Sequence, residues 1–220
     1  AWRMQRDFLF DAEFRGVDWA ATRDLYAPLV ERVGDRRELD DLLRQLVAEV
    51  GILHSQVRGG EYPSDPETAQ PSYLGGSFEP APEGLRLLHI YRTDPELPAD
   101  RAPLGRPGVE LRPGDILTRV NGRPVRDEGD LARALAHQSG EQVRLDYLRS
   151  GEEGSVVTHP VNAGRESFLR YSDWVTSRRE AVEEATGGRV GYLHLRAMGA
   201  GDMADFVREF YANVDRDGLV

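Results

Sequence analysis

Residues 108–125 constrain the fold more than any other part of the chain. They read GVELRPGDILTRVNGRPV, with a Pro-Gly turn, a short apolar run at residues 116–120 and then Asn121-Gly122. An Asn-Gly pair between strands is typical of a two-residue hairpin turn, in which both central residues need positive φ. Residues 127–130 are DEGD, and acidic residues there favour the start of a helix. We therefore predict strand, tight hairpin, strand and helix in this order.

Residues 114–122, GDILTRVNG, resemble the core of a PDZ domain, whose familiar form is G-D-x-I-x-x-V-N-G. The resemblance implies a PDZ-like β-sandwich or barrel with a helix, which we place at residues 72–164. Apolar and polar residues alternate at 85–91 and 143–148, which predicts two of its strands, and residues 155–161 read as its last strand.

Residues 74–78 lie just before the first of these strands and read LGGSF. In a PDZ domain the backbone N–H groups at this place form a nest for the C-terminal carboxylate of a peptide, which then adds to the sheet as a strand. An ordinary glycine turn entering a strand is the alternative. The residues that we expect to bind a peptide are Leu74, Gly75, Gly76, Ser77, Phe78, Leu131 and Leu135, with Leu85 beside Phe78.

The composition excludes several classes of function. The 220 residues are 40% hydrophobic and 30% charged, as in globular proteins, and the net charge of −10 argues against nucleic acid and anionic membranes as main partners. There is no Cys, so thiolate catalysis and Cys-based zinc sites are excluded. Every basic residue is Arg, so no Ser–Lys dyad exists within these residues. No apolar run approaches the ~20 residues of a membrane span. No His pairs with an acid at metal-ligand spacing, and we expect no metal and no cofactor.

Residues 1–62 are predicted to form a helical segment. Its first helix is expected to pack through Trp2, Phe8, Leu9 and Phe10. Asp18 is expected to cap a second helix, with a kink at Pro28 and an apolar stripe at Tyr26, Leu29, Val30 and Val33. The sequence from Asp35 to Glu38 is a variant of the capping box. The helix after it has the clearest stripe in the chain, formed by Leu39, Leu42, Leu43, Leu46, Val47 and Val50.

His54 follows this third helix closely. A lone His at such a place is more often a partly exposed residue that the helix macrodipole favours than a catalytic base. The residues by themselves leave both interpretations open. Three other histidines, His89, His159 and His194, are expected in strands, and His137 at a helix end.

A polar linker rich in Gly and Pro is predicted at residues 58–71, with a domain boundary inside it. Residues 165–220 then change character. We predict a long helix at 168–185 with a Gly187-Gly188 end, a buried strand at 190–195, a helix at 202–214 and a parallel strand from Gly218. A βαβ unit that stops at its second strand indicates the first, truncated part of an α/β domain.

Two further patterns do not indicate a functional site. Residues 199–204 read GAGDMA, which fits a dinucleotide-binding pattern, but Asp202 would put negative charge where a pyrophosphate should lie. No Ser has the G-x-S-x-G setting of a nucleophile elbow, so a Ser–His mechanism confined to these residues lacks a good nucleophile.

The order of a helical segment ending in His, a PDZ module and the start of an α/β domain resembles tricorn protease and its bacterial homologues, serine peptidases related to the C-terminal processing proteases. Segments related to that family are found at residues 16–19, 48–54, 74–78, 170–174 and 190–195. The resemblance implies a multi-domain α+β protein, with a helical core segment at 1–62, a PDZ domain at 72–164 and the start of an α/β catalytic core domain at 165–220.

The resemblance also implies that His54 is the general base of a serine peptidase. The family has a Ser directly before this His, where the present chain has Leu53, and Ser55 lies on the other side. The nucleophile, the oxyanion hole and the orienting acid fall beyond Val220 in the family. The implied enzyme is cytoplasmic, homo-oligomeric and metal-independent, and acts on short peptides.

Our first hypothesis is therefore that the chain is part of a tricorn-like serine peptidase, in which the PDZ module places or routes peptide substrates. We expect these 220 residues alone to hydrolyse no peptide bond. The rival hypothesis is a non-catalytic PDZ-type module that binds peptide C-termini.

Overall fold

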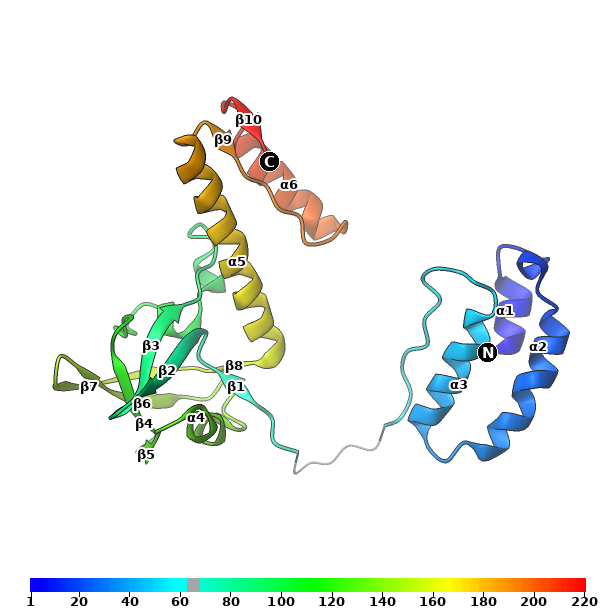
Figure 1. The fold of residues 1–220 in the computed structure, drawn as a ribbon, viewed down its shortest axis with the longest axis horizontal. Helices are drawn as coiled ribbons and strands as arrows, with labels where there is room; N and C mark the ends of the chain where they lie inside the picture. Colours follow the sequence, from blue (N-terminus) through cyan, green and yellow to red (C-terminus); the bar gives the residue numbers. More distant parts are fainter. Residues whose placement is uncertain (63–67) are drawn as a thin grey trace. The chain divides into compact units, whose positions relative to one another are not determined.

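The computed structural model describes residues 1–62 and 68–220, which form two compact units, Ala1–Thr68 and Ala69–Val220 (Figure 1). Residues 63–67, part of the predicted linker, lie outside the described residues. Each unit is described by itself. The helical segment, the antiparallel PDZ-like sheet and the later helix and strand elements confirm the predicted fold class.

The first unit is helical and packs around stacked aromatic rings. The Trp19 ring lies 6.5 Å from that of Trp2 and 5.2 Å from that of Phe14. Leu46 and Val50 complete its buried core. The elements of this unit are α1 (Trp2–Phe8), η1 (Phe14–Gly16), α2 (Trp19–Tyr26), η2 (Ala27–Arg32) and α3 (Arg36–Ala48).

The helix starts in this unit follow the predicted caps. Asp18 accepts a hydrogen bond from the backbone N–H of Ala21, and Asp35 accepts one from Glu38. The Glu38 side chain in turn accepts from the N–H of Gly34, one residue earlier than in a standard capping box. All six apolar residues of the α3 stripe are buried or half-buried, so that prediction is confirmed.

Two packing predictions in this unit are wrong. Phe8 and Phe10 are 83% and 84% exposed. The second apolar stripe also fails, because α2 ends at Tyr26 and Pro28 lies in the first turn of η2. A 3₁₀ helix turns 120° per residue, so the residues after Pro28 leave the face that an α-helix would give them. Leu29 and Val30 are therefore exposed.

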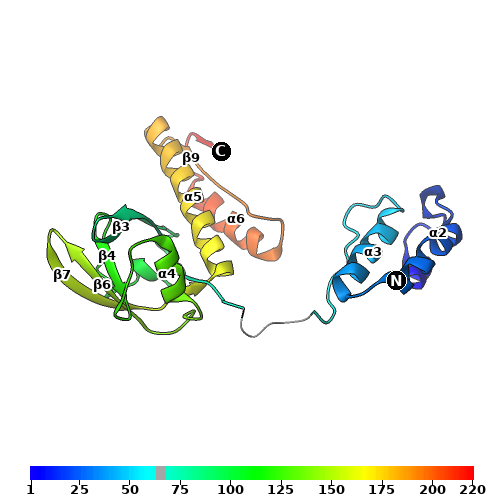
Figure 2. The same cartoon turned by 60° about the horizontal axis from the view of Figure 1, so that its bottom comes forward.

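The second unit is built on a six-stranded antiparallel sheet with the strand order β2-β3-β4-β6-β7, and β5 pairs with β4. A short pair, β1 with β8, lies outside that sheet. The bounds are β1 (Ser72–Tyr73), β2 (Gly76–Ala81), β3 (Gly84–Ile90), β4 (Ile116–Val120), β5 (Arg123–Pro124), β6 (Val143–Arg149), β7 (Glu152–Thr158) and β8 (Val161–Asn162), with α4 (Glu128–Leu135), η3 (Pro98–Asp100) and η4 (Pro103–Gly105). Helix α4 lies beside the first turns of the following helix, α5 (Ala163–Thr186), in both views (Figure 1 and Figure 2).

The predicted hairpin is confirmed. Asn121 and Gly122 have φ values of 49° and 77°, which a two-residue turn of this kind requires. Asp127 caps α4 by accepting from the N–H of Asp130. The core beneath is formed by residues that are 2% exposed or less, namely Leu85, Leu87, Leu104, Leu117, Val120, Val125, Leu135, Val143 and Leu145.

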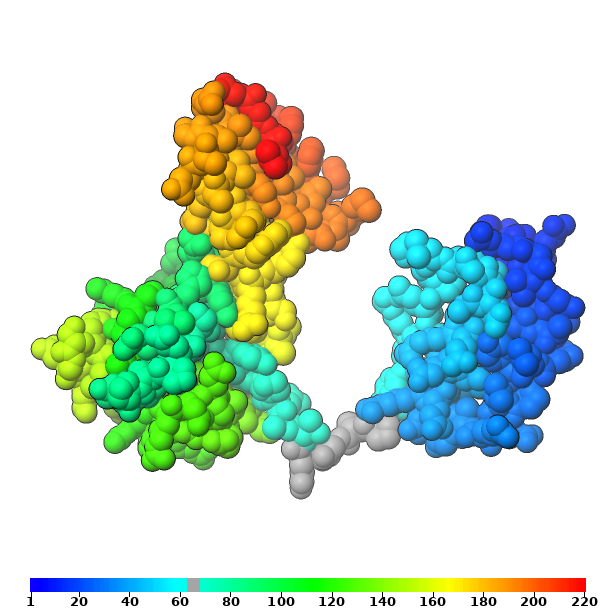
Figure 3. Space-filling model, viewed as in Figure 1, coloured from blue at the N-terminus to red at the C-terminus, as the bar shows by residue number. Residues whose placement is uncertain are grey.

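The chain leaves the sheet through α5 (Ala163–Thr186), which ends at Gly187 with a left-handed φ of 60°. β9 (Val190–Gly191), α6 (Ala200–Ala212) and β10 (Gly218–Leu219) follow, and β10 pairs with β9 in parallel, as predicted. Most of residues 72–162 surround the N-terminal part of α5, and residues 187–220 lie along the rest of the helix (Figure 3). The two sets overlap along α5, because Arg92 pairs with Glu180 and Arg196 donates to Ser172.

The predicted strand at 190–195 is reduced to two residues, because β9 has β10 as its one strand neighbour in the described part of the chain and only two residues of each are paired. His194 therefore lies after the strand, and His159 lies between β7 and β8. His89 is in β3, as predicted.

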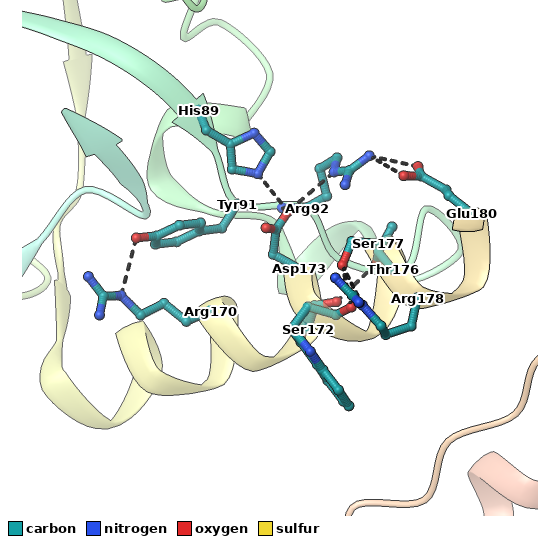
Figure 4. A network of polar contacts seen from close by, with 11 residues as sticks. His89, Tyr91, Arg92, Arg170, Ser172, Asp173, Thr176, Ser177, Arg178 and Glu180 are labelled. Atoms are coloured by element: carbon teal, nitrogen blue, oxygen red, sulfur yellow. Dashed lines mark hydrogen bonds and ion pairs between the residues drawn. The ribbon is translucent and has the colours of Figure 1, made fainter. Parts of the chain in front are cut away.

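A polar network joins β3 to α5 (Figure 4). The Asp173 carboxylate lies 2.7 Å from His89 Nε2 and accepts a hydrogen bond from the backbone N–H of Arg92 at 3.0 Å. The Arg92 side chain also pairs with Glu180 at 2.6 Å. Burial raises the pKa of Asp173, but the hydrogen bonds from Arg92 and His89 outweigh it and leave the pKa lowered. The network therefore ties the middle of α5 to the sheet.

Candidate functional site

A groove runs between edge strand β2 and helix α4. In the described part of the chain, β2 pairs with β3 and with no other strand, so one edge of the sheet is open on this side. The groove is lined by Pro71, Ser72, Tyr73, Leu74, Gly76, Ser77 and Phe78, by Glu128, Leu131, Ala132 and Leu135 of α4, and by Glu166 and Arg170 of α5. An open strand edge beside a helix is the geometry that allows an extended peptide to add as a further strand.

The loop before β2 is held rigidly at one end of the groove. The carbonyl of Leu74 accepts from the N–H of Leu104 at 3.2 Å, and that of Gly75 accepts from Tyr91 at 3.0 Å. Gly75 has a left-handed φ of 74°, and a Cβ there would lie 2.7 Å from the Cβ of Ala102. Glycine is therefore required at this position for both conformation and space.

Six of the seven predicted peptide-binding residues line this groove, namely Leu74, Gly76, Ser77, Phe78, Leu131 and Leu135. Gly75 lies between two of them without lining it. Leu85 does not belong to the groove: it is fully buried in the sheet core. The alternation of β3 places Leu85 and Leu87 on the covered face of the strand, so neither is available at the edge.

Sequence reasoning missed Glu166 and Arg170. They lie on successive turns of α5, and Arg170 Nε is 3.7 Å from a Glu166 carboxylate oxygen. An i,i+4 pair of opposite charge usually indicates a solvated helix face. Here Glu166 is only 6% exposed, because the first turn of α5 packs on the loop at Gly75, where Leu169 is fully buried.

The electrostatics of Glu166 are unusual for a surface groove. Burial raises the pKa of its carboxyl, while the Arg170 charge and the backbone N–H of Gly75 pull the pKa back; the net shift is upward. Its Oε2 atom is buried without a hydrogen-bond partner among the described residues. The groove thus carries a buried, under-satisfied carboxyl at the end where the Gly75 loop lies.

The loop that carries His54 is fastened to helices of the first unit at three points. Arg15 donates to the carbonyl of Gly51 at 3.0 Å, and Arg36 donates to that of Gly59 at 2.9 Å. Tyr62 donates to the buried carboxylate of Asp40, which also pairs with Arg36. The hydrogen bond from Tyr62 is the main reason that the pKa of Asp40 is lowered.

His54 itself is exposed and has a left-handed φ of 75°. Its side chain makes no hydrogen bond or ion pair with another described residue. Leu53 is 82% exposed and Ser55 half-buried. A non-glycine residue at positive φ is uncommon, and such positions are enriched at functional sites.

The remaining candidates carry no site. Asp202 accepts from the backbone N–H groups of Gly199 and Ala197, so its own carboxylate fills the helix start where a phosphate would bind in a dinucleotide site. Residues 1–62 and 68–220 contain no group of three His, Asp or Glu side chains that could hold a metal ion. No helix among them is long and apolar enough to cross a membrane.

Family comparisons agree with this geometry. Residues 1–48 match the model of the tricorn protease C1 domain, and residues 73–163 match that of the tricorn protease PDZ domain. The chain carries the C1 and PDZ domains of the tricorn protease family. The resemblance seen in the sequence is thereby confirmed.

Individual relatives extend over the whole chain. Tricorn protease homolog 1 of Streptomyces coelicolor is 36% identical over 226 residues, which cover 99% of this chain and 20% of the relative. The tricorn protease homolog of Saccharolobus solfataricus is 30% identical over 221 residues, again with 20% of the relative covered. The crystal structure of the tricorn protease matches with a TM-score of 0.87 at 21% identity, over 99% of this chain and 21% of that one, which shows a shared fold. The chain spans about a fifth of the length of these tricorn relatives.

Proposed function

We propose that this chain is the part of a tricorn-type serine peptidase that supplies the general base His54 and a groove for peptide substrates. The observation that carries the proposal is the open edge of β2 beside α4 in a domain of the tricorn PDZ type. A peptide would add along β2 and rest its side chains on Phe78, Leu131 and Leu135, while Leu74, Gly75, Gly76 and Ser77 form the backbone end of the groove.

His54 is proposed as the base because it matches the catalytic His of the family, is exposed and is held at a positive φ in a tethered loop. It would take the proton from a Ser outside these residues, and an acid outside them would orient its ring. The chain alone would then bind peptides without hydrolysing them. We further propose residues 165–220 as the start of the α/β catalytic domain, and a cytoplasmic, metal-independent homo-oligomer as the full enzyme.

The test uses the full-length enzyme and a fluorogenic peptide. His54→Ala should lower kcat/KM by at least roughly 10³-fold, the scale expected when a triad residue is lost. His137→Ala is the matched control, since His137 is also exposed and lies outside the groove and should leave the rate unchanged. Full activity in the His54 variant would reject His54 as the base. Peptide binding by a full-length protein without any peptidase activity would favour the rival binding module.

A further inference from the structure

One end of the peptide groove is closed by a carboxyl group of the chain itself. Glu166, on the first turns of α5, lines the groove together with Leu74 and Gly76 of the glycine loop. Only 6% of Glu166 is exposed, and its Oε2 atom has no hydrogen-bond partner among the described residues. The backbone N–H of Gly75 acts on this same carboxyl.

A free peptide C-terminus would meet unfavourable chemistry at this point. The N–H groups of the glycine loop are the donors that a terminal carboxylate needs, and that of Gly75 already lowers the pKa of the Glu166 carboxyl. The incoming carboxylate would also approach a carboxyl that is buried in low dielectric. Like charges brought together across an interface are strongly disfavoured. Arg170 offsets the Glu166 charge only in part, because its Nε lies 3.7 Å away and its side chain is 68% exposed.

A peptide whose chain continues past this end of the groove brings no terminal charge to Glu166. Its backbone presents a neutral amide with an N–H donor where a C-terminus would present an acceptor with a charge. Such a neutral amide avoids the like-charge repulsion that a terminal carboxylate would meet beside Glu166. Building on the proposed peptide-binding function, we propose that Glu166 makes this groove select internal, extended peptide segments and reject free C-terminal carboxylates.

Several groups surround Glu166 and would share in any dependence on pH. Arg170 lies on the same helix, Tyr73 lies beside Arg170 from β1, and Glu128 faces the groove from α4. Since the Arg170 guanidinium stays charged at all relevant pH values, acid conditions act on the Glu166 carboxyl, whose pKa is raised. Protonated Glu166 becomes a donor, so acid should relax the discrimination against free C-termini.

The experiment compares paired peptides on the 220-residue chain. A panel of labelled decapeptides ending in Val, Leu or Phe is made as free acids and as C-terminal amides, and binding is measured by fluorescence polarisation at pH 7.5 and pH 5.5. In the wild type we expect the amides to bind at least roughly tenfold more tightly than the acids at pH 7.5. The gap should narrow at pH 5.5. Glu166→Gln should bring acids and amides within about twofold at both pH values, whereas Glu128→Gln, an exposed carboxyl of the same groove, should keep most of the gap.

Each outcome is decisive. Tighter binding of free acids than of amides by the wild type would overturn the role of Glu166 and leave the peptide groove intact. A wild-type preference for amides that survives Glu166→Gln would also overturn it. No binding of any peptide to the wild type or to Glu166→Gln would reject the groove itself, and with it this inference. If Glu166→Gln does not fold, the wild-type pairs at the two pH values still decide.

Discussion

The Asp115 carboxylate holds the Arg149 guanidinium at two points, with Oδ1 2.8 Å from Nε and Oδ2 2.7 Å from Nη2. Asp115 is 3% exposed and also accepts from the backbone N–H of Arg112 at 2.7 Å. The pair therefore joins the turn before β4 to the end of β6. The Asp of the Gly-Asp pair that begins the PDZ motif therefore has a structural role, which is to hold these two segments together.

Asp115→Ala should lower the Tm of the PDZ-containing unit by at least roughly 10 °C, because it leaves a guanidinium and a backbone N–H without their buried acceptor. Differential scanning calorimetry measures the change. Glu79→Ala is the control: Glu79 pairs with Arg86 at 3.4 Å and both are nearly half exposed, so its Tm should hardly move. Equal shifts in the two variants would contradict this account.

Gly75→Ala should cost clearly more stability than Gly108→Ala. Both positions have positive φ, 74° and 84°, so both substitutions carry a backbone penalty of about 1 kcal/mol. Only at Gly75 does the added Cβ meet other atoms, with Ala102 at 2.7 Å and Pro103 at 2.8 Å, while Gly108 has open space. Overpacking adds about 1–3 kcal/mol. Urea unfolding measures the free energy of unfolding of both variants. Similar values would show that the loop at Gly75 shifts to make room for the added Cβ.

Glu166→Gln should stabilise the chain at neutral pH and not in acid. Burial raises the pKa of Glu166 above its ordinary value of 4.5, so folding penalises the ionised form. The penalty is absent below pH 4.5, develops as pH rises through the raised folded pKa and is complete above it. The Tm of the variant should therefore exceed that of the wild type at pH 7, and the two should converge near pH 4. A constant difference across this range would exclude titration of Glu166 as its origin.

Tyr62→Phe should loosen the loop that carries His54. It removes the hydroxyl that donates to buried Asp40 and leaves that carboxylate with Arg36. Trypsin cleavage after exposed Arg58, followed by mass spectrometry, should become several-fold faster, while α3 stays folded by circular dichroism. Tyr211→Phe is the control, since Tyr211 is 69% exposed and makes no side-chain hydrogen bond among the described residues. An unchanged rate of cleavage would show that the Tyr62 contact does not restrain the loop.

Local rules were enough for the elements whose signals lie close together in the chain. Asn121 and Gly122 take the positive φ values that their turn requires, and Asp18, Asp35 and Asp127 cap the helices that follow them. The same rules failed where a local pattern was interrupted. Pro28 changed the helix type and sent Leu29 and Val30 to the surface.

The sequence alone determined the PDZ motif and the helical segment before it, because each depends on residue types at short, fixed spacing. The resemblance to the tricorn family, not spacing, led to the proposal of His54 as the general base. Only the tertiary structure decided that Leu85 belongs to the core and Glu166 to the groove. Glu166 lies some ninety residues after Gly75, and an i,i+4 pair with Arg170 looks the same on a solvated helix and on a buried one. The rotation of α5 against the glycine loop made the difference, and that rotation depends on how Leu169 packs against the loop, which no local periodicity encodes.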